Sequence, residues 1–205
     1  MDSRERTLLA LAREEPDRVP VDCWLSMGTI RKICGRGRSG LDEFLDAHDV
    51  DLRYIEGPRY IGPPLGGDRD LWGVPRVAVN VPLRDATGLH HETFHEVSAS
   101  PLAACSAPEE IEAYAGWPSP DWFDYGAIET QCDAVRNAGR VAVFMGDRLN
   151  RIAQLKPAMY LRGTERIFID LAEPGGMADA IFGRIRAFYL EYERRILESA
   201  RGKID

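Results

Sequence analysis

The sequence predicts an α/β protein built around a parallel β-sheet. Three short apolar stretches, at residues 18–25, 50–55 and 141–145, are typical of buried strands, and stretches with helical periodicity separate them. Strands that alternate with helices pair in parallel, because each helix returns the chain to the same end of the sheet. Val141–Met145 is apolar throughout, as expected of a strand that helices cover on both faces.

Composition predicts a globular domain in the cytoplasm. The chain has 205 residues, 44% of them hydrophobic, which is enough for a sizeable core in one domain. No apolar run approaches the roughly 20 residues that cross a bilayer. The segment Met1–Arg6 carries no apolar signal sequence. We therefore expect no membrane partner.

Net charge and cysteine spacing bear on the possible ligands. The formal net charge is −7, whereas a nucleic-acid partner demands a basic face, so no nucleic acid is expected. A small anionic substrate remains compatible with this charge where arginines gather locally. The cysteines show no Cys-x-x-Cys pair, so they predict neither a zinc site nor a redox motif. They are Cys23, Cys34, Cys105 and Cys132.

The first half of the chain predicts short helices between the strands. Ser3 is the expected cap of a first helix that Glu15-Pro16 ends. Two further helices, around Thr29–Ile33 and Leu41–Leu45, separate the first strand from the second.

The pattern near residues 70–100 predicts an excursion from the parallel sheet in the form of a separate β-hairpin. Val77, Val79 and Val81 alternate with other residues, Gly88 indicates a turn, and residues 91–97 are typical of a returning strand. Further helices are expected at residues 108–111, 125–138 and 149–161, with Gly139 as the cap of the second.

The same excursion contains the zinc-protease pattern His-Glu-x-x-His at His91–His95. That chemistry requires a helix, on which residues i and i+4 share one face and bind one ion. Thr93, Phe94 and Val97 favour a strand instead, in which residues four apart are separated by about 13 Å. We therefore predict that His91 and His95 do not bind zinc together.

The end of the chain predicts one long helix and the start of a further strand. Apolar residues recur in steps of three and four through Met177–Ala200, which gives one helical stripe. Gly202 is a plausible stop for this helix, and Lys203–Asp205 then resembles the first residues of a strand. A TIM barrel has eight strands and roughly 250 residues. Residues 1–205 are therefore expected to form a single incomplete barrel domain.

Several segments resemble the uroporphyrinogen decarboxylase-like superfamily, whose members are single TIM barrels. Their order and spacing extend over nearly the whole chain, so the resemblance implies the N-terminal portion of a TIM (β/α)8 barrel. The matching segments are Ser3–Arg6 with Glu14–Asp22, Asp70–Val74, Tyr114–Tyr125, Leu161–Glu165 and the long helix with Gly202–Asp205.

The superfamily contains haem-pathway decarboxylases and methyltransferases that move methyl groups between cobamides and thiols. The resemblance implies a lyase that acts on a carboxylated tetrapyrrole or a related small molecule, with no cofactor in this chain. The first alternative is a corrinoid-dependent methyltransferase whose zinc ligands lie in the later half of the barrel. Only this alternative implies zinc or a cobamide. The second alternative is a non-catalytic fragment whose open barrel edge is covered by a partner chain or by a second copy.

The resemblance also implies site residues. The decarboxylases carry the run Arg-Gln-Ala-Gly-Arg after the first strand, where this chain has only Arg31. The family's aspartate after the second strand corresponds to Asp51, or less closely to Asp49. We expect Asp51 to be catalytic, and Arg31, Arg53 and Arg148 to bind substrate carboxylates, all at or after the carboxyl ends of strands. Asp51 and Arg148 are expected to open into one concave site, and no residue is predicted to bind a metal.

Overall fold

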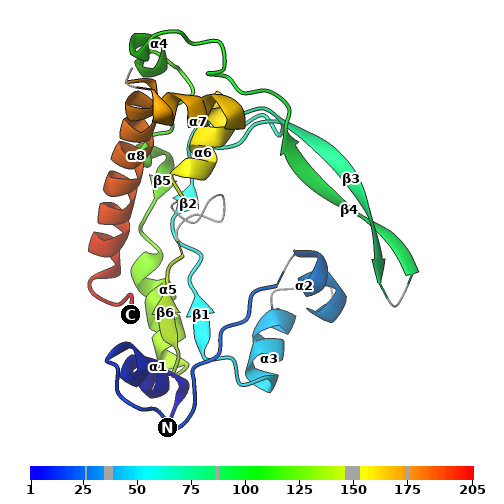
Figure 1. The fold of residues 1–205 in the computed structure, drawn as a ribbon. Coiled ribbons are helices and arrows are strands. Elements are labelled where there is room, and N and C mark those ends of the chain that lie inside the picture. The colour runs from blue at the N-terminus through cyan, green and yellow to red at the C-terminus, as the bar shows by residue number, and fades with distance from the viewer. Residues whose placement is uncertain (26, 35–38, 86–87, 146–152, 174–175) are drawn as a thin grey trace. The chain divides into compact units, whose positions relative to one another are not determined.

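A computed structural model gives the fold as two compact units, which are described separately. Unit 1 consists of residues 1–58, 125–145 and 196–205, and unit 2 consists of residues 59–124 and 146–195. Figure 1 labels the helices and strands. The structure describes residues 1–25, 27–34, 39–85, 88–145, 153–173 and 176–205.

Unit 1 begins with helix α1 (Ser3–Leu11), whose cap is Asp2 and not the predicted Ser3. The Asp2 carboxylate accepts a hydrogen bond from the Glu5 N–H, and the Glu5 carboxylate accepts one from the Asp2 N–H. This reciprocal pair satisfies two of the N–H groups that a helix start leaves open. Ser3 is instead buried, and its hydroxyl accepts a hydrogen bond from Arg140.

The centre of unit 1 is a parallel pair of strands, as predicted. β1 (Leu52–Tyr54) pairs with β6 (Val141–Val143), with Leu52 opposite Val141 and Tyr54 opposite Val143. Helix α5 (Ile128–Asn137) leads into β6 through Gly139, whose φ of 69° is the left-handed conformation that ends a helix. Between segment 18–25 and β1 lie α2 (Met27–Cys34) and α3 (Ser39–Ala47), which confirms both predicted helices.

Two extended segments lie beside this pair without forming regular strands. The Asp51 N–H donates to the Val21 carbonyl, at 2.8 Å, and the Val21 N–H donates to the Asp51 carboxylate, also at 2.8 Å. The prediction of a regular strand at residues 18–25 is therefore wrong. The Asp51 side chain accepts the Val21 N–H, which would bond to a backbone carbonyl in a regular pair of strands. On the other side, the Asp205 N–H donates to the Ala142 carbonyl at 3.0 Å. Val21 of segment 18–25 is thus bonded to Asp51, the residue before β1, while β1 pairs with β6 and Ala142 of β6 is bonded to Asp205, so these stretches follow one another in chain order.

Unit 2 contains two antiparallel pairs and several helices. β2 (Arg59–Tyr60) pairs with β5 (Phe123–Asp124), and β3 (Arg76–Asp85) pairs with β4 (Gly88–Val97) over ten residue pairs, as the predicted hairpin requires. The remaining elements are α4 (Pro108–Glu112), the 3-10 turn η1 (Pro120–Trp122), α6 (Leu155–Arg162), α7 (Thr164–Ala172) and α8 (Met177–Ala200), whose last residues belong to unit 1.

The core of unit 2 is aromatic. Trp72 is fully buried, and its ring meets Trp117, Phe188 and Tyr189 edge-on at centroid distances of 6.3, 5.3 and 5.7 Å. Phe188 and Tyr189 lie on α8, whose predicted bounds are confirmed. Helix α8 therefore supplies the apolar stripe that holds the loop around Trp72.

The described sheets have two strands each, and none of them closes into a barrel. The (β/α)8 assignment therefore stays a prediction. Within the ranges given above, no helix is both long enough and apolar enough to cross a membrane.

His91 and His95 lie on strand β4, opposite Pro82 and Ala78 of β3. The strand that motivated the prediction is thus confirmed, and residues four apart on it are separated by about 13 Å. We expect the purified chain to bind no stoichiometric zinc through these two side chains. Isothermal titration with Zn²⁺ checks this, and tight one-to-one binding that His91→Ala removes would contradict it.

Candidate functional site

Asp51 does not lie at the carboxyl end of a strand. β1 begins at Leu52, so Asp51 precedes the strand, and the expectation that it follows one is wrong. In a parallel α/β sheet ligands bind beyond the carboxyl ends of the strands, whereas the opposite end serves stability. The location of Asp51 therefore favours a structural role.

Asp51 is fully buried, and its carboxylate is saturated by hydrogen bonds. Arg6 Nη1 donates to Oδ1 at 2.7 Å, Arg18 Nη1 donates to Oδ2 at 2.6 Å, and the Val21 N–H donates to Oδ2 at 2.8 Å. Arg6 also holds Asp17, at 2.6 Å. The cluster joins α1, segment 17–21 and the start of β1 by ionic hydrogen bonds, of which the bond between Arg6 and Asp51 is buried and the others are partly exposed.

These contacts fix the ionisation of Asp51. Burial alone would raise the pKa of its carboxyl group, but hydrogen bonds from Val21, Arg18, Ser3 and Arg6 outweigh burial and lower the pKa to about 2. The hydrogen bond from Arg6 likewise lowers the pKa of Asp17. A carboxyl group held so firmly as an anion is a poor proton donor near neutral pH, which argues against Asp51 as a proton relay.

The predicted substrate arginines meet different outcomes. Arg53 lies in the middle of β1, and its guanidinium donates to Asp46 at 2.5 Å and to the Val50 carbonyl at 2.8 Å. Arg53 is thus occupied by α3 and by the residues just before its own strand. Arg31 lies on α2, and the position of its side chain is outside the described part of the chain. Arg148 also lies outside the described residues, and with it the proposed site shared with Asp51.

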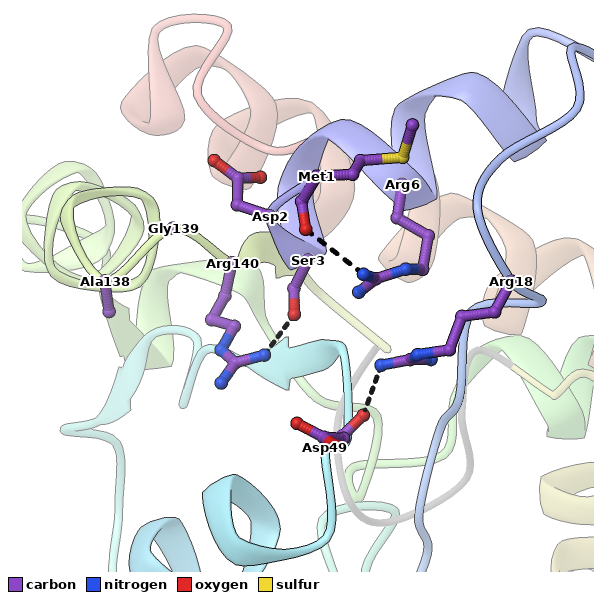
Figure 2. Close-up of a pocket in the computed structure, with 9 residues that line it drawn as sticks. All are labelled: Met1, Asp2, Ser3, Arg6, Arg18, Asp49, Ala138, Gly139 and Arg140. Carbon is purple, nitrogen blue, oxygen red and sulfur yellow. Dashed lines mark hydrogen bonds between the residues drawn. The ribbon is translucent and has the colours of Figure 1, made fainter.

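A pocket of about 350 Å³ opens at the amino end of β1 (Figure 2). Three arginines line it, but each already serves a carboxylate or a carbonyl group. Arg6 holds Asp51 and Asp17, Arg18 holds Asp51 and the Asp49 carbonyl, and Arg140 holds Ser3 and Asp46. The pocket therefore belongs to the structural ion cluster and is not a suitable anion site.

The carboxyl ends of the extended segments bring a different group together. Tyr54, the last residue of β1, donates its hydroxyl to Asp22 Oδ2 at 2.5 Å. The Trp24 ring meets the Tyr54 ring edge-on at 6.0 Å. Because side chains alternate along a strand, Tyr54 faces away from the α3 side that Arg53 occupies. We call Asp22, Trp24 and Tyr54 the carboxyl-end cluster.

The turn after β1 is rigidly held beside this cluster. Gln131 clamps Gly57 by donating to its carbonyl and accepting from its N–H, each at 3.0 Å. Gly57 has φ of 78°, and a Cβ there would lie 2.6 Å from Phe144 Cε2. Only glycine suits both the backbone angle and the close ring. The turn that follows β1 is therefore fixed at Gly57.

The sequence contains a pattern that predicts this cluster, although the family resemblance implied Asp51 instead. Asp22 and Trp24 are two residues apart in one extended segment, as are Tyr54 and Glu56 in the next. Alternation alone places each pair on one face. A carboxylate and a phenol near the ends of neighbouring extended segments would have predicted a site at Asp22 and Tyr54 in place of Asp51.

Comparison with known proteins gives no relative: no protein-family model, no curated protein and no solved structure matches this chain. Among the described side chains, no three His, Cys, Asp or Glu residues gather so that they could hold a metal ion.

Proposed function

We propose that the chain supplies consecutive strands of a uroporphyrinogen decarboxylase-like barrel that acts on a small carboxylated molecule. The observation that carries the proposal is the order of the extended segments in unit 1. Segment 18–25, β1, β6 and Asp205 follow one another in chain order through hydrogen bonds, and β1 and β6 are parallel. Such an order, with a helix before each new strand, is how a (β/α)8 barrel is built.

The site of this enzyme is the carboxyl-end cluster. Tyr54 and Asp22 lie where barrel enzymes place their reacting groups, and the ion cluster around Asp51 lies at the opposite end of β1. This division agrees with a stable amino end and a reactive carboxyl end. Asp51 is therefore proposed as a structural residue, in place of the catalytic role expected from the sequence.

Decarboxylation needs a proton donor near the carbon that loses CO₂. The C–C bond to the carboxylate breaks, CO₂ leaves, and the electron pair stays on the carbon until a proton reaches it. In our proposal, Tyr54 delivers that proton and regains one from water. Asp22 is a positioning residue, because the hydrogen bond that it accepts holds the phenol in place until the hydroxyl turns to the carbon and transfers its proton.

One observation favours the methyltransferase alternative. A tetrapyrrole with several carboxylates needs several cations, but Arg53 is held by Asp46 and by backbone carbonyls, and Asp51 retains Arg6 and Arg18. The described part of the carboxyl-end cluster offers a carboxylate, a phenol and an indole. A corrinoid-dependent methyl transfer makes no such demand for cations. In that reading the same cluster would bind the methyl acceptor or donor, and zinc ligands would come from residues outside the cluster.

Replacing Tyr54 tests the proposal. We expect Tyr54→Phe to lower kcat for release of CO₂ from a carboxylated tetrapyrrole by roughly 10²- to 10⁴-fold, the range of general acid catalysis, with little change in KM. Asp22→Asn should keep a hydrogen bond and shift the pH profile of kcat. Chromatography of the porphyrin products under anaerobic conditions measures both effects.

The matched control is Tyr60→Phe, because the Tyr60 hydroxyl donates to the Pro63 carbonyl, within unit 2. Equal losses in both tyrosine variants would contradict the assigned site. A chain that transfers a methyl group from methylcobalamin to a thiol, but releases no CO₂, would favour the alternative.

A further inference from the structure

Trp24 is a large apolar side chain that stays half exposed at the carboxyl end of unit 1. It is 50% exposed, although the Tyr54 ring meets it at 6.0 Å. Trp72 and Trp117, by contrast, are buried in the core of unit 2. A single exposed apolar residue needs no explanation by itself, but Trp24 lies beside the phenol to which we assign proton transfer. Its exposed surface is therefore at the place that the substrate of this site would occupy.

The two rings stand at right angles and form a corner. Their planes enclose 88°, so the edge of one ring points to the face of the other. A flat molecule that stacks on the indole is parallel to it and meets the phenol at the same right angle. Offset stacking and edge-on contact are the two arrangements that aromatic rings prefer. One aromatic ring bound at this corner can thus make a favourable contact with each wall.

Charge at the cluster decides which part of an anionic substrate binds here. Asp22 Oδ1 accepts from the Cys23 N–H at 2.8 Å, and Oδ2 accepts from the Tyr54 hydroxyl at 2.5 Å. Both oxygens of this carboxylate thus have a donor, and a second carboxylate placed beside it would be repelled. Arg53, the residue before Tyr54 on β1, is held by Asp46. Within its described residues, the cluster therefore suits the neutral ring of a substrate and not its carboxylate.

We propose that Trp24 determines the substrate class of this site, which is an aromatic acid. The ring next to the departing carboxylate stacks on the Trp24 indole, and the carboxylate points away from Asp22. The inference rests on the proposed function, because stacking serves catalysis only if Tyr54 is the proton donor to the bound molecule. A saturated acid of the same charge presents no flat face, so the site discriminates against it. Trp24 is thus a specificity-determining residue that takes no part in proton transfer.

Binding of two matched acids to the full chain tests the assignment and does not depend on turnover. 1-Naphthoate and decahydro-1-naphthoate carry the same charge on the same carbon skeleton, but only the first is flat. In isothermal titration, the wild type should bind 1-naphthoate about 10-fold more tightly than the saturated acid. Trp24→Leu should remove this preference, and Trp24→Phe should restore most of it, because phenylalanine keeps a ring for stacking.

Val19→Ala is the matched control, since Val19 is 80% exposed on the same segment and lies outside the cluster. This variant should keep the wild-type preference. Circular dichroism confirms that the variants are folded. If Trp24→Leu keeps the preference, or if the wild type shows none, the role of Trp24 is overturned.

Tyr54→Phe separates this inference from the proposed function. The variant retains the ring beside Trp24 and should bind 1-naphthoate as the wild type does. Loss of the preference in Trp24→Leu, together with unchanged CO₂ release in Tyr54→Phe, would support ring binding at Trp24 and contradict the assigned proton donor. Loss of CO₂ release in Tyr54→Phe, with the preference unchanged in Trp24→Leu, would support the donor and overturn the ring site.

Discussion

Asp51→Ala is expected to destabilise unit 1 by about 3–5 kcal/mol, because the change removes one member of a buried ion cluster and leaves charges behind. Arg18 loses the carboxylate that it holds at 2.6 Å, and the Val21 N–H loses its acceptor. Arg6 keeps Asp17 and the Met1 carbonyl. Urea unfolding followed by circular dichroism measures the loss.

Hydrogen exchange of the β1 and β6 amides shows whether the loss is confined to unit 1. Glu14→Ala is the control, since this exposed residue lies after α1 and its replacement should change the free energy of unfolding by no more than about 0.5 kcal/mol. Equal stability of Asp51→Ala and the wild type would contradict the structural role of Asp51 and return it to the candidate catalytic residues.

The same carboxylate gives the wild type a defined response to acid. The pKa of Asp51 is lowered from 3.8 to about 2, so its contribution to stability is fully present above the unfolded value. That contribution is lost as the pH falls through about 4 toward 2. The difference in unfolding free energy between the wild type and Asp51→Ala should therefore shrink over this interval, although other carboxylates titrate in both proteins.

The sequence predicted elements better than it predicted their ends. The helix at Met177–Ala200 has a long apolar period between clear breakers, so its bounds were correct. β1 was expected at residues 50–55 but begins at Leu52, because Asp51 gives its side chain to segment 18–25. Even the predicted bounds place Asp51 near the amino end of this strand, so the expectation that it follows a strand came from the resemblance alone. The start of β1 itself differs from the prediction by two residues. A periodic pattern cannot locate such an end, since a tertiary hydrogen bond decides it.

The candidate site was harder to predict for the same reason. Arg53 follows the alternation of a strand, yet only the structure shows that its face meets α3 and Asp46. Asp22 and Tyr54 are 32 residues apart in the sequence and become neighbours only when their segments pair. The resemblance implied a single aspartate, Asp51, whereas the paired segments bring together the carboxylate of Asp22 and the phenol of Tyr54.

The largest effect expected in unit 2 comes from Arg162, which belongs to the Leu161–Glu165 segment of the resemblance. Its side chain is almost fully buried and donates to the Leu102 carbonyl at 2.6 Å, to the Cys105 carbonyl at 2.8 Å and to Asp170 at 2.6 Å. One guanidinium thus joins α6, α7 and the loop before α4. A planar donor with several N–H groups suits this task in a way that lysine does not.

Arg162→Met should therefore lower the free energy of unfolding of unit 2 by about 3–5 kcal/mol, since it leaves a buried carboxylate and two buried carbonyls without their donor. Arg166→Met, an exposed change on α7, is the control. Tryptophan fluorescence is the measurement, because Trp72, Trp117 and Trp122 all lie in unit 2. If Arg162→Met unfolds at the same denaturant concentration as Arg166→Met, the hydrogen bonds of the Arg162 guanidinium do not stabilise unit 2. The loop before α4 would then be held by its apolar contacts alone.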